Sequence, residues 1–337
     1  MPDPTLDVVA IGHAIVDVLT HADDEILEDL QLAKGAMALI DAHQAESLYA
    51  AMGPAIEVSG GSAANTAAGI ASFGGAVAFV GKVRQDELGA VFTHDIQAEG
   101  VVYTTPPAHE GPATARCLVL VTPDAQRTMS TYLGAAAGLS PDDLDDDVIA
   151  SAQITYLEGY LWDPPDAIAA LRRAMDVAHA AGRRVAFSLS DPFCVERHRY
   201  EFRDLVDGEV DVLFANEAEV VSLTGAGSLD EAVEALAGHC DLAAVTRGPQ
   251  GSVVLEGGSA TEVPAMPVDE VVDTTGAGDL YAAGFLYGLT HGAEPETCAS
   301  LGGLAAAEVI SHVGARPQVS LAELATRGEL AMDDRRR

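Results

Sequence analysis

Positive charge is what this sequence most lacks. It has 18 lysine and arginine residues against 52 aspartate and glutamate residues, a formal net charge of −34, and its only lysines are Lys34 and Lys82. Such a surface repels phosphate backbones and anionic lipid, which argues against nucleic-acid and membrane partners. If the chain handles a phosphorylated ligand, that ligand's charge must be neutralised locally, by helix N-termini and a bound Mg²⁺.

Several familiar motifs are also missing. No apolar run reaches the roughly 18 residues that a membrane-spanning helix needs, and Met1–Pro4 lacks the basic start of a signal peptide. The four cysteines form no CxxC pair, which predicts reduced thiols and, with the first two absences, a cytoplasmic protein. Neither the GxGxxG fingerprint nor the P-loop pattern occurs, so a dehydrogenase that uses a glycine fingerprint is disfavoured.

Regular alternation of strands and helices is what the sequence has instead. Apolar runs such as Leu6–Gly12, Ile154–Gly159 and Leu242–Thr246 are separated by helical segments. This alternation predicts an α/β fold, with a central, mostly parallel sheet covered by helices on both faces. No repeat or composition break divides the chain, so we expect one domain over residues 1–337 with a small β lid, formed by segments near 13–41 and 101–133.

The stretch Asp273–Asp279, which reads Asp-Thr-Thr-Gly-Ala-Gly-Asp, stands directly before an apolar run that begins at Leu280. Its glycines allow a tight turn, and the N–H groups at the start of the predicted helix form a site for an anion such as a phosphate. Asp279 places a carboxylate beside that anion, where a base would take a proton from an attacking hydroxyl. The alternative is that the glycines only make a turn and Asp279 only favours the helix N-terminus.

A second glycine-rich segment, Gly60-Gly61, precedes a run of small residues that predicts a closely packed helix. Asn65 lies one turn into this helix, where its amide can bind a polyhydroxylated ligand. Asp17 is a lone acid among apolar neighbours, and a buried carboxylate needs either a protein donor or a ligand hydroxyl. Ordinary packing is the alternative for both segments.

Two polar segments follow predicted strands nearer the C-terminus. Asn216 and Glu219 follow one strand, and the turn at 246–251 follows the next. Ligands of parallel sheets bind beyond the carboxyl ends of the strands, which is where both segments fall. Neither is specific alone, because an Asn and a Glu three residues apart usually cap a helix.

In combination and in order along the chain, these segments resemble the signature regions of the PfkB, or ribokinase-like, family of carbohydrate and nucleoside kinases. The resemblance covers essentially the whole chain, and the 273–279 signature is highly specific. It implies a ribokinase-like fold and an ATP-dependent kinase that phosphorylates an alcohol group with the help of Mg²⁺.

The resemblance also implies a role for each matching residue. Asp279 corresponds to the catalytic base, and the N–H groups of Gly276, Ala277 and Gly278 correspond to the anion hole. The residues that would bind ribose or sugar hydroxyls are Asp17, Gly60, Gly61 and Asn65. The residues that would lie beside ATP are Asn216, Glu219, Thr246, Gly248 and Gly251, with Glu219 positioning Mg²⁺ through water. Asp273 and Thr275 match positions that bind a monovalent cation such as K⁺ in some members.

The acceptor is implied less directly. Segments 34–37, 158–165 and 190–194 look most similar to bacterial members classed as adenosine kinases, which implies adenosine as acceptor and AMP as product. A purine needs an aromatic or apolar sandwich, for which the candidates are Tyr132, Trp162, Phe193 and Met37, and each of these could equally be ordinary packing. The alternatives are a sugar kinase acting on ribose, fructose or a related carbohydrate, and a non-catalytic homologue that only binds nucleoside or sugar. Both a monomer and a homodimer fit the sequence.

Overall fold

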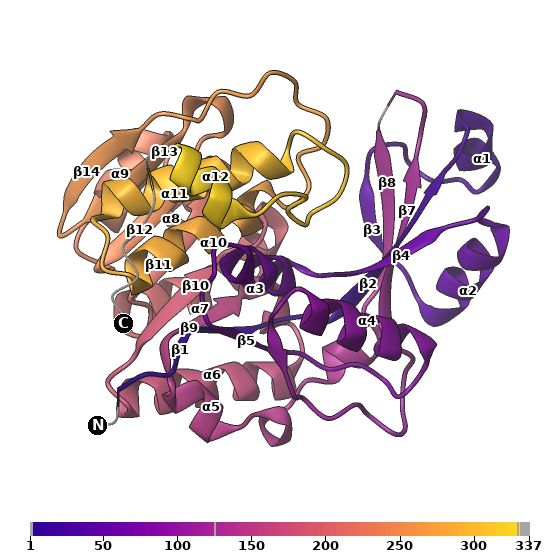
Figure 1. Ribbon diagram of the computed structural model, residues 1–337, viewed down its shortest axis with the longest axis horizontal. Coiled ribbons are helices and arrows are strands. Elements are labelled where there is room, and N and C mark those ends of the chain that lie inside the picture. Colours follow the sequence, from indigo (N-terminus) through magenta and orange to yellow (C-terminus); the bar gives the residue numbers. More distant parts are fainter. Residues whose placement is uncertain (1–2, 125, 329, 331–337) are drawn as a thin grey trace.

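Two β-sheets organise the chain, of which the computed structural model describes residues 3–124, 126–328 and 330 (Figure 1). The larger sheet has nine strands in the order β14-β13-β12-β11-β10-β9-β1-β5-β6. Its strands are β1 (Leu6–Ile11), β5 (Val77–Val80), β6 (Val102–Tyr103), β9 (Ala152–Glu158), β10 (Arg184–Ser188), β11 (Val212–Asn216), β12 (Leu242–Thr246), β13 (Ser252–Glu256) and β14 (Ser259–Val263). All neighbours from β12 to β6 pair in parallel, so their carboxyl ends share one edge.

Each face of the large sheet is covered by its own layer of helices. Alternate residues of β1 separate into two cores, with Val8 and Ala10 in one and Val9 and Ile11 in the other. The first core contains α3 (Ser62–Ser72), α4 (Glu87–Ala98), α10 (Ala277–Thr290), α11 (Pro295–Val309) and α12 (Leu321–Arg327). The second contains α5 (Asp146–Ala150), α6 (Pro165–Ala180), α7 (Pro192–Gly208), α8 (Glu217–Thr224) and α9 (Leu229–Leu236). The predicted α/β architecture is therefore confirmed.

One edge of the large sheet is antiparallel, which the sequence analysis did not anticipate. β13 pairs antiparallel with both β12 and β14. Gly257 and Gly258 join β13 to β14 with φ angles of 54° and 83°. Two consecutive residues with positive φ produce the tight turn that suits a two-stranded hairpin, so the chain turns back here without a crossover helix.

The smaller sheet has five strands in the order β3-β8-β7-β2-β4 and projects from one side of the large sheet (Figure 1). Its strands are β2 (Ile15–His21), β3 (Met37–Leu39), β4 (Ile56–Gly60), β7 (Ala115–Val121) and β8 (Arg127–Tyr132), and α1 (Asp24–Asp29) and α2 (Ala42–Ala51) accompany them. β2, β3, β7 and β8 fall in the two segments predicted to form a lid. β4 is an addition, because it pairs with β2, and β6 instead extends the large sheet. That this sheet moves as a lid stays a prediction.

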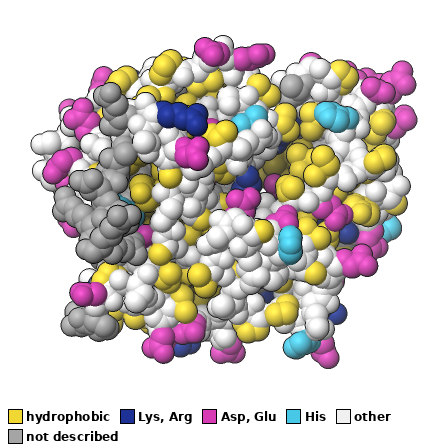
Figure 2. Space-filling model, viewed as in Figure 1, with side chains coloured by type: hydrophobic (Ala, Val, Ile, Leu, Met, Phe, Trp, Pro, Cys, Tyr) yellow, Lys and Arg dark blue, Asp and Glu magenta, His cyan; other side chains and the backbone are white. Residues whose placement is uncertain are grey.

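Acidic side chains are spread over both parts of the molecule on the face drawn in Figure 2. No helix among the described residues has the length and apolarity needed to cross a membrane. Residues 331–337 of the domain predicted for 1–337 lie outside the described residues.

Candidate active site

The N-terminus of α10 forms a turn that only glycine permits. Gly276 precedes the helix with a left-handed φ of 79°, and a Cβ built on it would lie 2.8 Å from the Cβ of Ala315. Among the described residues, the N–H groups of Gly276, Gly278 and Asp279 have no hydrogen-bond partner, whereas that of Ala277 donates to the Thr274 carbonyl at 3.2 Å. Free N–H groups at a helix N-terminus attract an anion. The turn predicted to form the anion hole thus has three free N–H groups, and that of Asp279 is free in place of that of Ala277.

The two glycine-rich segments meet at the Asp279 side chain. Ser62 Oγ donates to Asp279 Oδ1 at 2.6 Å, and Asn65 Nδ2 donates to Asp279 Oδ2 at 2.9 Å. Thr66 Oγ1 also donates to the Asp279 carbonyl at 3.1 Å. Residues more than two hundred positions apart thus share one hydrogen-bond network, and the structure brings together the base and the amide that the sequence singled out.

Burial makes Asp279 more basic than a surface carboxylate. It raises the pKa of Asp279 to about 6, although the bonds from Ser62 and Asn65 lower it, Glu158 raises it and Arg316 lowers it. At pH 7.5 the group is therefore mostly ionised. A carboxylate with a raised pKa accepts a proton more readily, which suits general-base chemistry.

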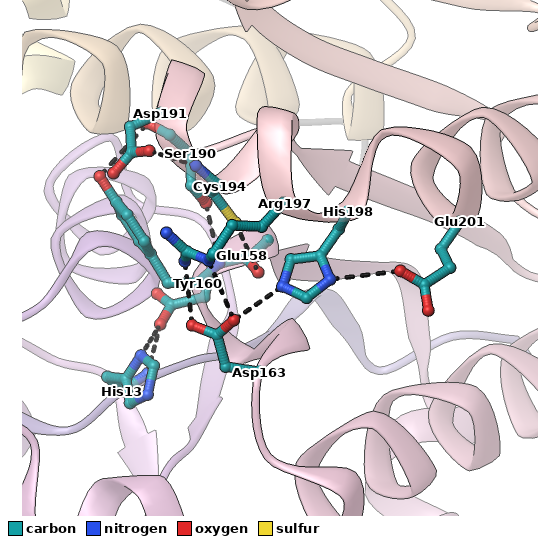
Figure 3. Close-up of polar contacts among 11 residues, drawn as sticks. His13, Glu158, Tyr160, Asp163, Ser190, Asp191, Cys194, Arg197, His198 and Glu201 are labelled. Atoms are coloured by element: carbon teal, nitrogen blue, oxygen red, sulfur yellow. Dashed lines mark hydrogen bonds and ion pairs between the residues drawn. The ribbon is translucent and has the colours of Figure 1, made fainter.

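Glu158, at the end of β9, supports the first turn of α3. Its Oε1 accepts from the backbone N–H of His13 and contacts His13 Nδ1, both at 2.7 Å (Figure 3). Its Oε2 accepts from Ala63 N–H at 3.0 Å. Gly61 begins the helix with a φ of 98°, and a Cβ there would overlap the His13 carbonyl. The sequence analysis did not predict the contact between Glu158 and His13, although a glutamate at the end of an apolar strand could have indicated a buried polar contact.

Asp17 lies on β2 with its carboxylate against Gly60. A Cβ on Gly60 would overlap the Asp17 carboxylate, so glycine is needed for this approach. Burial raises the pKa of Asp17 to about 6, while the charges of Arg316 and Arg127 lower it. No protein group among the described residues donates a hydrogen bond to this carboxylate, which leaves it available for ligand hydroxyls.

Arg127, on β8, links the small sheet to the glycine loop and was missed by the sequence analysis. Its Nη2 lies 2.8 Å from Asp273 Oδ2, and Nη1 lies 3.4 Å from Thr275 Oγ1. Asp273 also accepts from Thr275 N–H, Thr275 Oγ1 and Gly314 N–H. Arg127 already neutralises this carboxylate, so charge balance requires no monovalent cation here, and the K⁺ site predicted at Asp273 and Thr275 stays a prediction.

A cavity of about 340 Å³ extends from Asp279 toward the carboxyl ends of β11 and β12. Its walls include Tyr160, Asn216, Glu219 and Thr246 as well as the glycine loop. Gly248 and Gly251 lie in the turn beyond β12 and do not line it. The cavity has the size of a small-molecule site, and it joins the predicted base to the predicted nucleotide residues.

Asn216 and Glu219 form a capping box at the start of α8. Asn216 N–H donates to Glu219 Oε2 at 2.9 Å, and Glu219 N–H donates to Asn216 Oδ1 at 2.9 Å. Burial raises the pKa of Glu219 to about 7, and Asp191 raises it further, against the lowering effect of the Asn216 N–H. Asn216 and Glu219 therefore do cap the helix. The buried Glu219 carboxylate also faces the cavity, and no cation among the described residues pairs with it.

Replacing Gly276 by Ala is expected to destabilise the protein by about 1–3 kcal/mol, because alanine is strained at this φ and its Cβ meets Ala315. Thermal and urea unfolding would measure the loss. Gly278→Ala is the matched control, since a Cβ there meets nothing within 4 Å and alanine favours the helix. Equal stability losses in the two variants would contradict this account of the turn.

A protein-family model for the pfkB family of carbohydrate kinases matches residues 54–321 of this chain, which contain α3, the cavity and α10. The chain belongs to the PfkB family. As a member of this family, it is an ATP-dependent phosphotransferase, with the mixed α/β fold of ribokinase-like kinases.

Individual relatives span almost the full chain. An adenosine kinase of Saccharomyces cerevisiae is 30% identical over 92% of this chain and 96% of its own length. The crystal structure of adenosine kinase from Sinorhizobium meliloti is 53% identical, with a TM-score of 0.90 over 96% of this chain and 99% of the other. A probable sugar kinase from Rhizobium etli is 50% identical, with a TM-score of 0.91 over 97% of this chain and 99% of the other. The kinase therefore resembles proteins named for both acceptor classes.

Proposed function

We propose that this kinase transfers the γ-phosphoryl group of ATP to the primary hydroxyl of adenosine, giving AMP and ADP. The observation that carries the proposal is the Asp279 carboxylate, held by Ser62 and Asn65 beside the free N–H groups that begin α10. The similarity to adenosine kinases of yeast and Sinorhizobium meliloti supports adenosine as the acceptor. Use of ATP also fits the cytoplasmic location predicted from the sequence.

The inner face of the small sheet supports an acceptor with a flat apolar part. On this face Asp17 stands in register with Cys117, and Cys117, Val119 and Val121 pack with Met129 in a separate apolar cluster. Met37, in register with Met129, is 51% exposed beside them. A carboxylate for hydroxyls next to apolar side chains matches the ribose and base of a nucleoside better than it matches a bare sugar.

The aromatic residues that the sequence suggested for a sandwich around the purine lie in different parts of the structure. Trp162 is 0% exposed and packs against Phe187 and Phe202 in the core, so for this candidate the alternative of ordinary packing holds. Tyr132 stands in register with Arg116, whose guanidinium lies 6.0 Å from its ring, and it therefore belongs to the opposite face of the small sheet from Cys117. Phe193 is 73% exposed on α7.

Tyr160 is an aromatic ring of the cavity wall that the analysis of the sequence had not singled out. Its side chain extends toward Asp191, and its hydroxyl donates to the Ser190 carbonyl at 3.3 Å (Figure 3). Of the four earlier candidates, Met37 lies beside the apolar face that we assign to the acceptor, and we propose Tyr160 as the aromatic partner of the adenine ring.

The chemistry assigned to the chain is proton transfer and charge stabilisation. The acceptor hydroxyl lies against Asp279 and gives its proton to that carboxylate as its oxygen bonds to the γ-phosphorus. The bond from that phosphorus to the β–γ bridging oxygen breaks, and ADP leaves with the electron pair. The N–H groups of Gly276 and Gly278 stabilise the negative charge on the oxygens of the transferred phosphoryl group. Catalysis thus comes mostly from this charge stabilisation and from positioning of the two reactants.

Mg²⁺ fits the far wall of the cavity, where Glu219 supplies a buried carboxylate and Asn216 an amide. Among the described residues no group of three or more His, Cys, Asp or Glu side chains could hold a metal by itself. This is consistent with an ion held mainly by phosphates and waters, with Glu219 binding one of those waters. When bound, Mg²⁺ neutralises phosphate charge, as the scarcity of basic residues requires.

The need for free Mg²⁺ should depend on pH through Glu219. Because the pKa of Glu219 is raised to about 7, the carboxyl is mostly protonated at pH 6 and ionised at pH 8. At a fixed total ATP concentration, the Mg²⁺ concentration for half-maximal rate is expected to fall by about tenfold between pH 6 and 8. In Glu219→Gln the protonation of ATP still changes with pH, but the Glu219 carboxyl is absent. An equally large fall in the Mg²⁺ requirement of that variant would contradict the role assigned to Glu219.

A substrate panel tests the proposed function. Purified wild-type protein is given ATP, Mg²⁺ and K⁺ with adenosine, ribose or fructose, and ADP and the phosphorylated product are measured. We expect adenosine turnover with kcat/KM at least about 100-fold above that for either sugar, since only the nucleoside uses the apolar face. Preference for a sugar would favour the acceptor class of the Rhizobium etli relative, and binding of adenosine without ADP formation would show a non-catalytic protein.

A further inference from the structure

The loop that follows α11 contacts both the glycine loop and the acceptor segment, although nothing in the analysis of the sequence pointed to it. Gly314 N–H donates to Asp273 Oδ2 at 3.0 Å, and Ala315 lies directly against Gly276. The next residue, Arg316, reaches the opposite side of the site. Three consecutive residues therefore contact the glycine loop and the acceptor segment together.

Arg316 holds the acceptor segment through three hydrogen bonds. Its Nε donates to the Ser59 carbonyl at 3.2 Å, and Nη2 donates to Ser59 Oγ at 3.3 Å. Nη1 donates to the Ala64 carbonyl at 2.7 Å. Ser59 and Ala64 bracket Gly60-Gly61, and Ala64 directly precedes Asn65, the residue that donates to Asp279. One guanidinium thus spans β4 of the small sheet and α3 of the large domain.

The surroundings fix both ends of this contact. On the loop side, Glu308 Oε1 accepts from Gln318 N–H at 2.9 Å and from His312 Nε2 at 3.1 Å. On the other side, Ser59 N–H donates to Asp95 Oδ2 at 3.1 Å. A guanidinium with a planar set of donors and anchored acceptors has little freedom to leave, so its charge is held in one place.

That charge lies among carboxylates. Burial lowers the pKa of the Arg316 guanidinium, and the charges of Glu99, Asp17, Asp279 and Asp95 partly offset this lowering. In return, Arg316 lowers the pKa of both Asp17 and Asp279. Asp17 and Asp279 interact electrostatically, and the other described charged and titratable groups that interact with one or both are Glu158, Cys117, Tyr156, Tyr160, Arg127 and Arg316. Only the two arginines in that set are cations, and Arg127 is already paired with Asp273.

We infer that Arg316 is a positioning residue of this kinase, which sets Gly60–Asn65 against the start of α10 and supplies the positive charge that keeps Asp17 and Asp279 ionised. The inference rests on the proposed function, because it names the groups through which Arg316 acts. The inferred role of Arg316 differs from that of the residues predicted to bind the acceptor or ATP. Arg316 contacts no reacting atom and acts through the residues that do.

The test compares pH profiles of kcat/KM for adenosine from pH 5.5 to 9 in three proteins. In Arg316→Met the acid-side midpoint is expected to move up by about one pH unit, so that activity lost at pH 6.5 returns at pH 8.5. Arg316→Lys keeps the charge but loses the fork of donors, so its midpoint stays near that of the wild type while kcat falls at all pH values. Arg173→Met is the matched control, since Arg173 makes comparable bonds to Asp146 and Pro141 away from the site.

Parallel profiles for wild type and Arg316→Met, with one uniform loss, would overturn the electrostatic role. An unchanged kcat in Arg316→Lys would overturn the role in alignment. Should Arg316→Met fail to fold, Arg316→Gln removes the charge while keeping an amide donor and carries the same prediction. The wild-type profile is measured first with the best acceptor of the substrate panel, so that failure of adenosine as substrate is seen separately from failure of this inference.

Discussion

Asp279→Asn is expected to lower kcat by about 10²–10⁴-fold at pH 7.5 while adenosine still binds. Asn cannot take the hydroxyl proton, but it can keep the network, because its amide oxygen accepts from Asn65 and its NH₂ group donates to Ser62 Oγ. Steady-state kinetics gives kcat, and calorimetric titration with adenosine gives the affinity. A variant with near-normal kcat would refute the assignment of the base.

The same variant should unfold at a higher temperature than the wild type. The pKa of Asp279 is about 6 in the folded protein and about 3.9 in an unfolded chain, so this group favours folding below pH 4 and that contribution is lost as the pH rises through 6. Removing the charge at pH 7.5 is therefore expected to stabilise by on the order of 1 kcal/mol, and not at all at pH 4. Equal effects at both pH values would contradict the sign of the shift.

Asp166→Asn is the matched control for both measurements. Asp166 also lies in the first turn of a helix, α6, but it is exposed and lies outside the cavity. Its replacement should leave kcat unchanged and should not raise the unfolding temperature, since only the interaction with the helix dipole is lost.

Asp17→Asn is expected to raise KM for adenosine by about 10²–10³-fold and to change kcat much less. The Asp17 carboxylate has no protein donor among the described residues, so two charge-assisted bonds to ribose hydroxyls would be lost, at about 1.5–3 kcal/mol each before the partial compensation by Asn. Initial rates over a range of adenosine concentrations measure both constants.

Comparing adenosine with 2′-deoxyadenosine sharpens this test. The wild type should bind 2′-deoxyadenosine more weakly than adenosine. Asp17→Asn should bind the two nucleosides with similar affinity, because this variant has already lost the bond to the 2′-hydroxyl. Asp24→Asn, on the outer side of the small sheet and paired with Lys34, is the control that should behave as the wild type. Additive losses in Asp17→Asn would show that this carboxylate does not bind the hydroxyl.

Local patterns predicted the elements that depend on neighbours in sequence. Buried parallel strands read as continuous apolar runs, and the glycines before α10 signal a turn with free N–H groups, so both were recognised. For Trp162 the sequence left both a core and a ligand site open, because a large aromatic residue next to a turn has the same local pattern in either, and the structure places it in the core. The β13–β14 hairpin escaped notice since its strands are short and its turn is the only local signal.

The residues that sequence reasoning missed act over long separations. Arg127 meets Asp273, and Arg316 meets Ser59 and Ala64, from positions more than a hundred residues away. An isolated arginine carries no periodic or motif signal, and its partner is defined only when two strands or loops are packed together.

The sequence alone determined the fold class and the glycine turn before α10, because both follow from hydrophobic period and backbone freedom over a few residues, and its resemblance to the PfkB family predicted Asp279 as the base. Only the tertiary structure decided which side chains contact Asp279, which N–H groups of the turn are free, and which guanidinium binds Ser59 and Ala64. The physical reason is that hydrogen bonds, burial and Coulomb interactions depend on distance in space, and segments 60–65, 273–279 and 314–316 become neighbours only once the sheets and helices pack.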